Sequence, residues 1–163
     1  MGCLVPITPP VTDQEVSTSL WGIPITNLVN TLEARTVTHY IATLGSVTSL
    51  PYGSRATLAT INMPATPAGT KLDISWTSYM NSSVVGHQCG FLRAIVNGVE
   101  LAPTTVIPDM VALASWSGRV VNVAAPTNVA YTVLLQADKG ASGGTIAAQA
   151  AGNTNLCVVA YRP

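Results

Sequence analysis

Residues 71–77 read Lys71-Leu72-Asp73-Ile74-Ser75-Trp76-Thr77, a strict alternation of polar and apolar side chains. Successive side chains of a β-strand point to opposite faces of the sheet, so Leu72, Ile74 and Trp76 are expected to face a core. The polar residues between them would then face outward. A sheet with one buried and one exposed face is typical of antiparallel architectures, which makes all-β the predicted fold class.

A hairpin is predicted further along the chain at Asn97-Gly98, between Ile95-Val96 and Val99-Glu100-Leu101. Both turn residues tolerate the positive φ that a type I′ turn requires. Other Gly, Pro and Asn clusters recur at short intervals and separate further period-two segments. The predicted strands are Thr36–Leu44, Arg55–Met63, Lys71–Met80, Gly90–Val96, Val99–Leu101 continuing toward Ile107, Val111–Trp116, Arg119–Ala124, Val129–Ala137, Gly144–Ala150 and Asn155–Arg162.

Many short strands with turns every 8–12 residues predict an antiparallel, jelly-roll-like β-sandwich, here assigned to residues 36–163. Residues 1–35 are predicted to be a separate arm and short anchor helix. Within residues 1–20, Pro6, Pro9 and Pro10 disfavour helix, so this segment is expected to be an extended arm that docks on a neighbour.

One short helix is predicted over residues 21–34, because Pro24 suits a first helical turn. Ile25, Leu28, Val29 and Leu32 follow at i, i+3, i+4 and i+7 and form one apolar stripe. A helix of this length is marginal alone, so the stripe must pack on another surface. Trp21, before the helix, is either an interface anchor or an aromatic that folds back into the core.

Charged residues make up 9% of the chain, against about 25% in an average soluble protein. The hydrophobic fraction of 48% excludes disorder, and the apolar runs are too short to span a bilayer. Seven basic and seven acidic residues are scattered singly, which argues against binding nucleic acid or an anionic membrane. So little charge predicts a large covered interface, as in an oligomer or assembly subunit.

No constellation for catalysis is found in the sequence. The chain has two histidines, His39 and His87, and the closest pairing of chemical groups is His87-Gln88-Cys89. Zinc requires three or four ligands, and no others lie nearby. The carboxylates are isolated along the chain, and Lys139–Thr145 lacks the order of a phosphate-binding loop. The prediction is therefore a protein without enzymatic activity, metal or cofactor.

The cysteines, Cys3, Cys89 and Cys157, form neither an even disulfide framework nor a metal cluster. Cys157 lies in an apolar strand pattern and is expected to be a buried thiol. This usage fits synthesis in a reducing host cytoplasm.

Four segments carry a family resemblance: Leu20–Leu32, Arg93–Leu101, Tyr131–Ala137 and Leu156–Arg162. The first resembles the Leu-Trp…Asn-x-x-Asn opening of small tailed-bacteriophage virion proteins. The others look like the trimeric β-sandwich heads of phage decoration proteins and fibre tips, loosely similar to complement and tumour-necrosis-factor jelly rolls. The resemblance implies a homotrimer on the exterior of a virus particle.

The favoured role is a capsid decoration, or cement, protein that binds and stabilises the major capsid protein lattice. The residues expected to anchor it on the capsid or a neighbour are Val5, Ile7, Leu20, Trp21, Ile25, Leu28, Val29 and Leu32. The trimer-interface candidates are Trp76, Tyr79, Leu134 and Leu135.

Two alternatives are kept. A tail- or head-fibre tip would bind a host receptor through loops such as Asn81–His87 or Lys139–Gly144, although no shaft repeats are present. A carbohydrate-active enzyme on a jelly roll would need two carboxylates that converge in space.

Overall fold

The computed structural model describes residues 37–82, 90–102, 105–107, 114–140, 145–150 and 152–163. These residues belong to one compact unit, Val37–Pro163. The predicted arm and helix, residues 1–35, lie outside the described residues.

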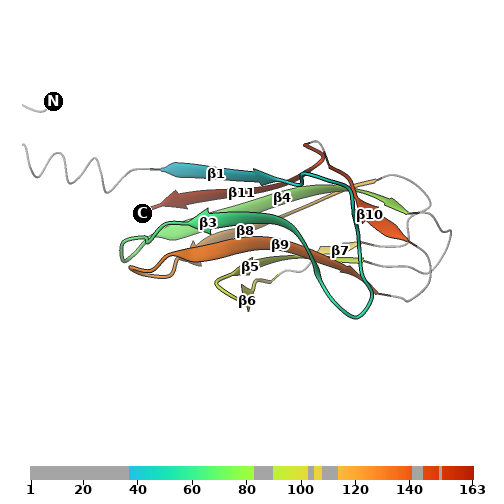
Figure 1. The fold of residues 1–163 in the computed structure, drawn as a ribbon. Coiled ribbons are helices and arrows are strands. Elements are labelled where there is room, and N and C mark those ends of the chain that lie inside the picture. The colour runs from blue at the N-terminus through green and yellow to red at the C-terminus, as the bar shows by residue number, and fades with distance from the viewer. Residues whose placement is uncertain (1–36, 83–89, 103–104, 108–113, 141–144, 151) are drawn as a thin grey trace, which may run out of the picture. The chain divides into compact units, whose positions relative to one another are not determined.

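The described residues form strands and no helix, so the all-β prediction is confirmed for this part of the chain (Figure 1). The strands are β1 (Thr38–Thr43), β2 (Thr48–Ser49), β3 (Ala56–Met63), β4 (Lys71–Ser82), β5 (Gly90–Val96), β6 (Val99–Glu100), β7 (Thr105–Ile107), β8 (Ala114–Ala124), β9 (Tyr131–Lys139), β10 (Ile146–Ala148) and β11 (Thr154–Tyr161).

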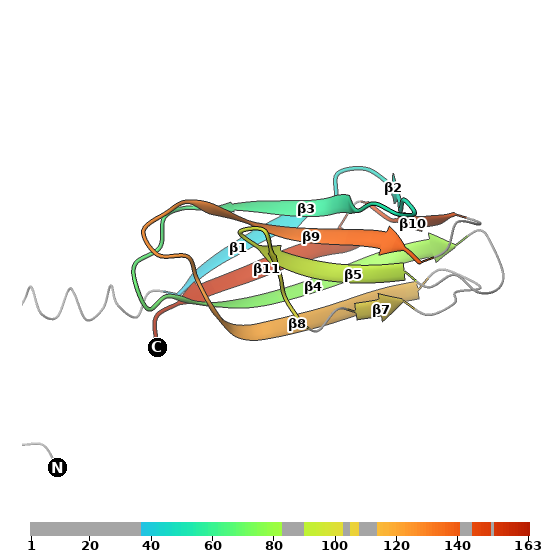
Figure 2. The ribbon, with the colours of Figure 1, turned by 90° about the horizontal axis from the view of Figure 1, so that it is seen from below.

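The strands form two sheets that pack face to face (Figures 1 and 2). We call them sheet A, with the order β1-β11-β4-β10-β2 and β8 on the other edge of β4, and sheet B, with the order β3-β9-β5-β6 and β7 also paired with β5. Every strand pairing in both sheets is antiparallel.

The alternation in β4 has the predicted effect, because Leu72, Ile74 and Trp76 are at most 2% exposed. Strands β9 and β11 repeat the same in-and-out burial pattern. The inward side chains of both sheets form one apolar core, whose fully buried members include Leu92, Leu135 and Leu156. Burial of a side chain of this size contributes about 1.5–3 kcal/mol, so this core is the main source of stability.

The predicted hairpin is confirmed at Asn97-Gly98, where both residues have positive φ, 48° and 81°. The turn joins β5 to β6, with Val96 opposite Val99 and Ile95 opposite Glu100.

Three details of the strand prediction were wrong. Gly118 does not divide Val111–Trp116 from Arg119–Ala124, because β8 runs through it while paired with β4. The strand after Asn97-Gly98 ends at Glu100, and Thr105–Ile107 forms a separate strand on the other end of β5. The two-residue β2 was not predicted, since its pairing with β10 comes from the fold and not from a local pattern.

Cys157 was expected to be buried, but it is a half-buried free thiol. Its neighbours Leu156 and Val158 are the residues of β11 that face the core. The strand therefore presents Cys157 on the outer face of sheet A. Because its neighbours in the sequence are also apolar, the sequence pattern did not show which of these residues face the core.

Candidate functional site

The predicted anchor residues cannot be placed. Val5, Ile7, Leu20, Trp21, Ile25, Leu28, Val29 and Leu32 all lie outside the described residues, and their role stays a prediction. His87 and Cys89 also lie outside them. Within the described ranges, no group of three His, Cys, Asp or Glu side chains could hold a metal ion. No described helix has the length and apolar character needed to cross a membrane.

The four trimer-interface candidates occupy different environments. Trp76 and Leu135 are buried in the core of a single copy, with 2% and 0% exposure. Tyr79 and Leu134 are half-buried on the outer faces, Tyr79 on sheet A and Leu134 on sheet B. The structure does not bring the four together on one surface, so only Tyr79 and Leu134 are available to touch another molecule.

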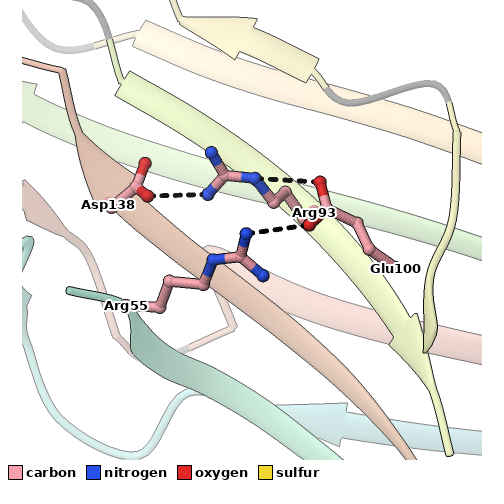
Figure 3. A network of polar contacts seen from close by, with 4 residues as sticks. All are labelled: Arg55, Arg93, Glu100 and Asp138. Carbon is pink, nitrogen blue, oxygen red and sulfur yellow. Dashed lines mark hydrogen bonds and ion pairs between the residues drawn. The ribbon is translucent and has the colours of Figure 1, made fainter. Parts of the chain in front are cut away.

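The outer face of sheet B carries a network of four charged side chains centred on Arg93 (Figure 3). The Nη1 group of Arg93 lies 2.8 Å from Oδ2 of Asp138, and its Nε lies 3.1 Å from Oε1 of Glu100. Arg55 binds the other oxygen of Glu100 at 2.8 Å. The Arg93 guanidinium also lies 5.1 Å from the centre of the Phe91 ring, within range of a cation–π contact.

This network joins segments that are distant in sequence. Arg55 precedes β3, Arg93 lies in β5, Glu100 in β6 and Asp138 in β9. Its two cations and two anions balance, and the Arg93 side chain is only 12% exposed. Paired in this way, the four charges fix the β5–β6 hairpin to the sheet and leave little net charge on its surface.

The sequence had shown the carboxylates only as isolated residues. The structure brings Glu100 and Asp138 to opposite sides of Arg93, both bound to its guanidinium. A pair of glycosidase carboxylates must instead face each other across the scissile bond. Glu100 and Asp138 do not have this arrangement, and the absence of enzymatic activity stays a prediction.

A second polar cluster lies on the outer face of sheet A around Asp73. The backbone N–H of Asn122 donates to Oδ1 of Asp73 at 2.9 Å, and Arg119 donates to Oδ2 at 2.8 Å. The Tyr161 hydroxyl donates to Oδ1 at 3.3 Å. Asn122 has φ of 60° at a register shift between β4 and β8, so the carboxylate holds a β-bulge in place.

These surroundings shift the pKa values of the Asp73 carboxyl and the Tyr161 hydroxyl. The pKa of Asp73 lies below its ordinary value, chiefly because the Asn122 N–H donates to the carboxylate and also because of Arg119. The pKa of Tyr161 is raised, first by loss of contact with water and then by the charge of Asp73.

Cross-strand rows on the outer face of sheet A are mostly uncharged. Thr43, Asn155, Thr77 and Ser117 form one such row across β1, β11, β4 and β8. The next row begins with Ile41, Cys157 and Ser75 and has Arg119 at its end. Ile41 is 70% exposed. These two rows of the face therefore carry mainly apolar, hydroxyl and amide side chains.

Strand β1 also contributes the described histidine, His39, which lies exposed beside Tyr40. Neither the exposed Ile41 nor the charged network was predicted from the sequence. A strand pattern reveals which residues share a face, but which strand becomes an edge and which charges meet depends on the order of strands in the sheet.

No protein-family model matches this chain, and neither does any curated protein. Among solved structures, dimeric latent PorU from Porphyromonas gingivalis is similar with a TM-score of 0.54 and 7% identity over 79% of this chain. A structure of infectious bursal disease virus, Gt strain, has a TM-score of 0.46 and 16% identity over 76% of this chain. The VP2 subviral particle of that virus has a TM-score of 0.40 and 18% identity over 77%.

The chain spans 13% of the PorU chain and 33% and 37% of the two viral chains. At this level of identity, the likeness to PorU shows a shared β fold alone.

Proposed function

We propose that this chain is a structural protein of a bacteriophage virion, a homotrimeric capsid decoration protein that binds the outside of the capsid and stabilises the major capsid lattice. The observation that carries the proposal is the mostly uncharged outer face of sheet A, where Asp73 and Arg119 pair with each other and Ile41, Cys157 and hydroxyl-bearing residues lie in register across the strands. A face of this kind is better suited to contact with protein than to solvent alone.

The order of the strands supports a jelly roll. Without the short strands β2, β6 and β10, sheet A reads β1-β11-β4-β8 and sheet B reads β3-β9-β5-β7. The first and last strands are then neighbours, and consecutive strands such as β3 and β4 lie in opposite sheets. This order is the one expected of a double-sheet jelly roll, a fold that recurs in viral capsid and lectin domains, and it supports the proposal.

The charge distribution agrees with a structural role. The charged groups of the network on sheet B neutralise one another, as do Asp73 and Arg119 on sheet A. In both clusters the described carboxylates are held by arginine side chains, whereas acyl or glycosyl transfer would need a base free to act beside a nucleophile. Fold alone does not set function, so this surface chemistry is what separates the proposal from a jelly-roll enzyme.

The anchor residues of the proposal are those of the arm and helix, with Trp21 and the stripe that includes Leu28 as the largest apolar groups. Many copies that each bind weakly would hold a capsid lattice through multivalency. An arm that reaches a neighbouring subunit would add buried area at each copy.

The test is co-sedimentation of the full chain, and of a variant that lacks residues 1–34, with capsids that carry no decoration protein. The full chain is expected to pellet with capsids, and the shortened variant to stay in the supernatant. A control with Val99→Lys, an exposed position of β6, should pellet like the full chain. Equal pelleting by the shortened variant would contradict the anchor, and binding to host cells in place of capsids would favour the fibre tip.

A further inference from the structure

The outer edge of β1 carries backbone groups without a partner among the described residues. On its other side β1 pairs with β11 from Thr38 to Thr43, and just beyond it the N–H of Leu44 donates to the Thr154 carbonyl at 3.0 Å. Backbone groups of alternate residues point in opposite directions in an antiparallel strand. The N–H and C=O groups of His39, Ile41 and Thr43 therefore point away from β11, toward the free edge.

Natural sheets protect their edges with charges, prolines, bulges or short strands. Strand β8 carries Arg119 and the bulge at Asn122, and β3 has a register shift after Thr57. The strands β2, β6 and β7 are only two or three residues long. Among the described edge strands longer than three residues, β1 is the one without any of these protective features.

The sequence of β1 favours pairing with a second copy of the same strand. Thr38-His39-Tyr40-Ile41-Ala42-Thr43 contains no Asp, Glu, Lys, Arg or Pro, and its pairing with β11 has no register shift. Ile41, near the middle of the strand, is 70% exposed on the outer face. A second copy of such a strand would bring no like charges together and would cover the exposed isoleucine.

We propose that β1 pairs antiparallel with β1 of a second copy, about a two-fold axis beside Ile41. In this register Ile41 faces Ile41 of the second copy, and His39 faces Thr43. Every outward-pointing N–H and C=O group of the strand then finds a partner, giving about six backbone hydrogen bonds. Sheet A becomes continuous across two copies, and the two isoleucines form an apolar cross-strand pair.

The contact is small. One strand pair covers less than the ~1,200 Å² that a standard stable interface buries, so the association is expected to be weak in dilute solution. It is a two-fold contact, distinct from any three-fold contact, and does not depend on a role in a virion. Two monomers joined in this way would form a dimer, and trimers, each with three β1 edges, would form hexamers or larger assemblies.

The first test is sedimentation equilibrium of the full chain over micromolar to near-millimolar concentrations, beside Ile41→Lys and the matched control Val99→Lys. Both positions are exposed, at 70% and 64%, so both variants should fold. The wild type and Val99→Lys are expected to approach at least twice the mass of Ile41→Lys as concentration rises. Equal masses for all three proteins would overturn the proposal.

The second test is amide hydrogen exchange, which does not depend on a substitution. The Ile41 N–H should become protected as concentration rises, while the Tyr40 N–H, which points to β11, should be protected throughout. An Ile41 N–H that exchanges freely at all concentrations would overturn the pairing. Protection that is constant with concentration would do so too, because it would mean that another part of the same chain covers the edge.

Discussion

At the scale of single residues, Asp73 links the stability of sheet A to pH. Its carboxylate accepts hydrogen bonds from Asn122, Arg119 and Tyr161. Its folded-state pKa lies below the ordinary value of 3.8 that the unfolded chain should show. The stabilisation is therefore fully present above the unfolded-state pKa and is lost as pH falls through the folded-state pKa.

Replacement of Asp73 by Asn should remove this dependence. The variant is expected to have a lower free energy of unfolding at neutral pH, and the difference from wild type should shrink as pH falls below about 4. Urea unfolding at several pH values measures it. Thr77→Asn, on the same face of β4, serves as control, and an Asp73→Asn deficit that is unchanged at acidic pH would contradict the assignment.

Arg93 holds two carboxylates, and its side chain is 12% exposed. Arg93→Leu would leave Asp138, 18% exposed, without its cation, so we expect a loss of about 2–3 kcal/mol of unfolding free energy. Arg55→Leu breaks an ion pair whose side chains are 41% and 37% exposed and should cost under about 1 kcal/mol. Equal losses in the two variants would show that Arg93 is not the centre of the network.

At the scale of elements, the β5–β6 turn depends on backbone conformation. Gly98 has φ of 81°, and a Cβ added there would meet no atom within 4 Å. Gly98→Ala should therefore cost about 1 kcal/mol through backbone strain alone. Gly45 also has open space around a Cβ but no positive φ, so Gly45→Ala should be neutral or slightly stabilising. Thermal unfolding of the two variants compares them, and equal midpoints would contradict the turn assignment.

Much of the strand and turn structure could be predicted from local sequence. The alternation at Leu72, Ile74 and Trp76 gave the buried face of β4, and Asn97-Gly98 gave the hairpin. Pairing between distant segments could not be predicted, because it is set by the packing of the whole sandwich. Arg93 meets Asp138, and β1 becomes an edge, only after the strands are arranged in their sheets.

Local sequence was also insufficient to identify residues of a candidate interface. The interface residues predicted from sequence were large apolar residues of amphipathic strands, and two of them, Trp76 and Leu135, lie in the core. Size and hydrophobicity do not distinguish a core residue from an interface residue. The exposed Ile41 was missed because its strand pattern is weak and its exposure follows from the position of β1 in sheet A.

At the scale of the whole molecule, the proposed function makes a prediction about mass. A homotrimer of the 16.9 kDa chain should show about three times that mass by light scattering. The variant Leu134→Asp should lower the mass if Leu134 lies in the three-fold contact, whereas Thr132→Asp, on the same outer face of β9, serves as control. A wild-type protein that stays monomeric at high micromolar concentration would contradict the proposed homotrimer.

Under the proposed function, this sandwich is covered by other protein surfaces on the outside of a virus particle. A low-resolution image of the native particle that contains this protein tests that statement most directly. We predict density for the sandwich at many symmetry-related positions on the outer capsid surface. Capsids bare of such density, with the protein found only at a fibre tip or outside the particle, would contradict it.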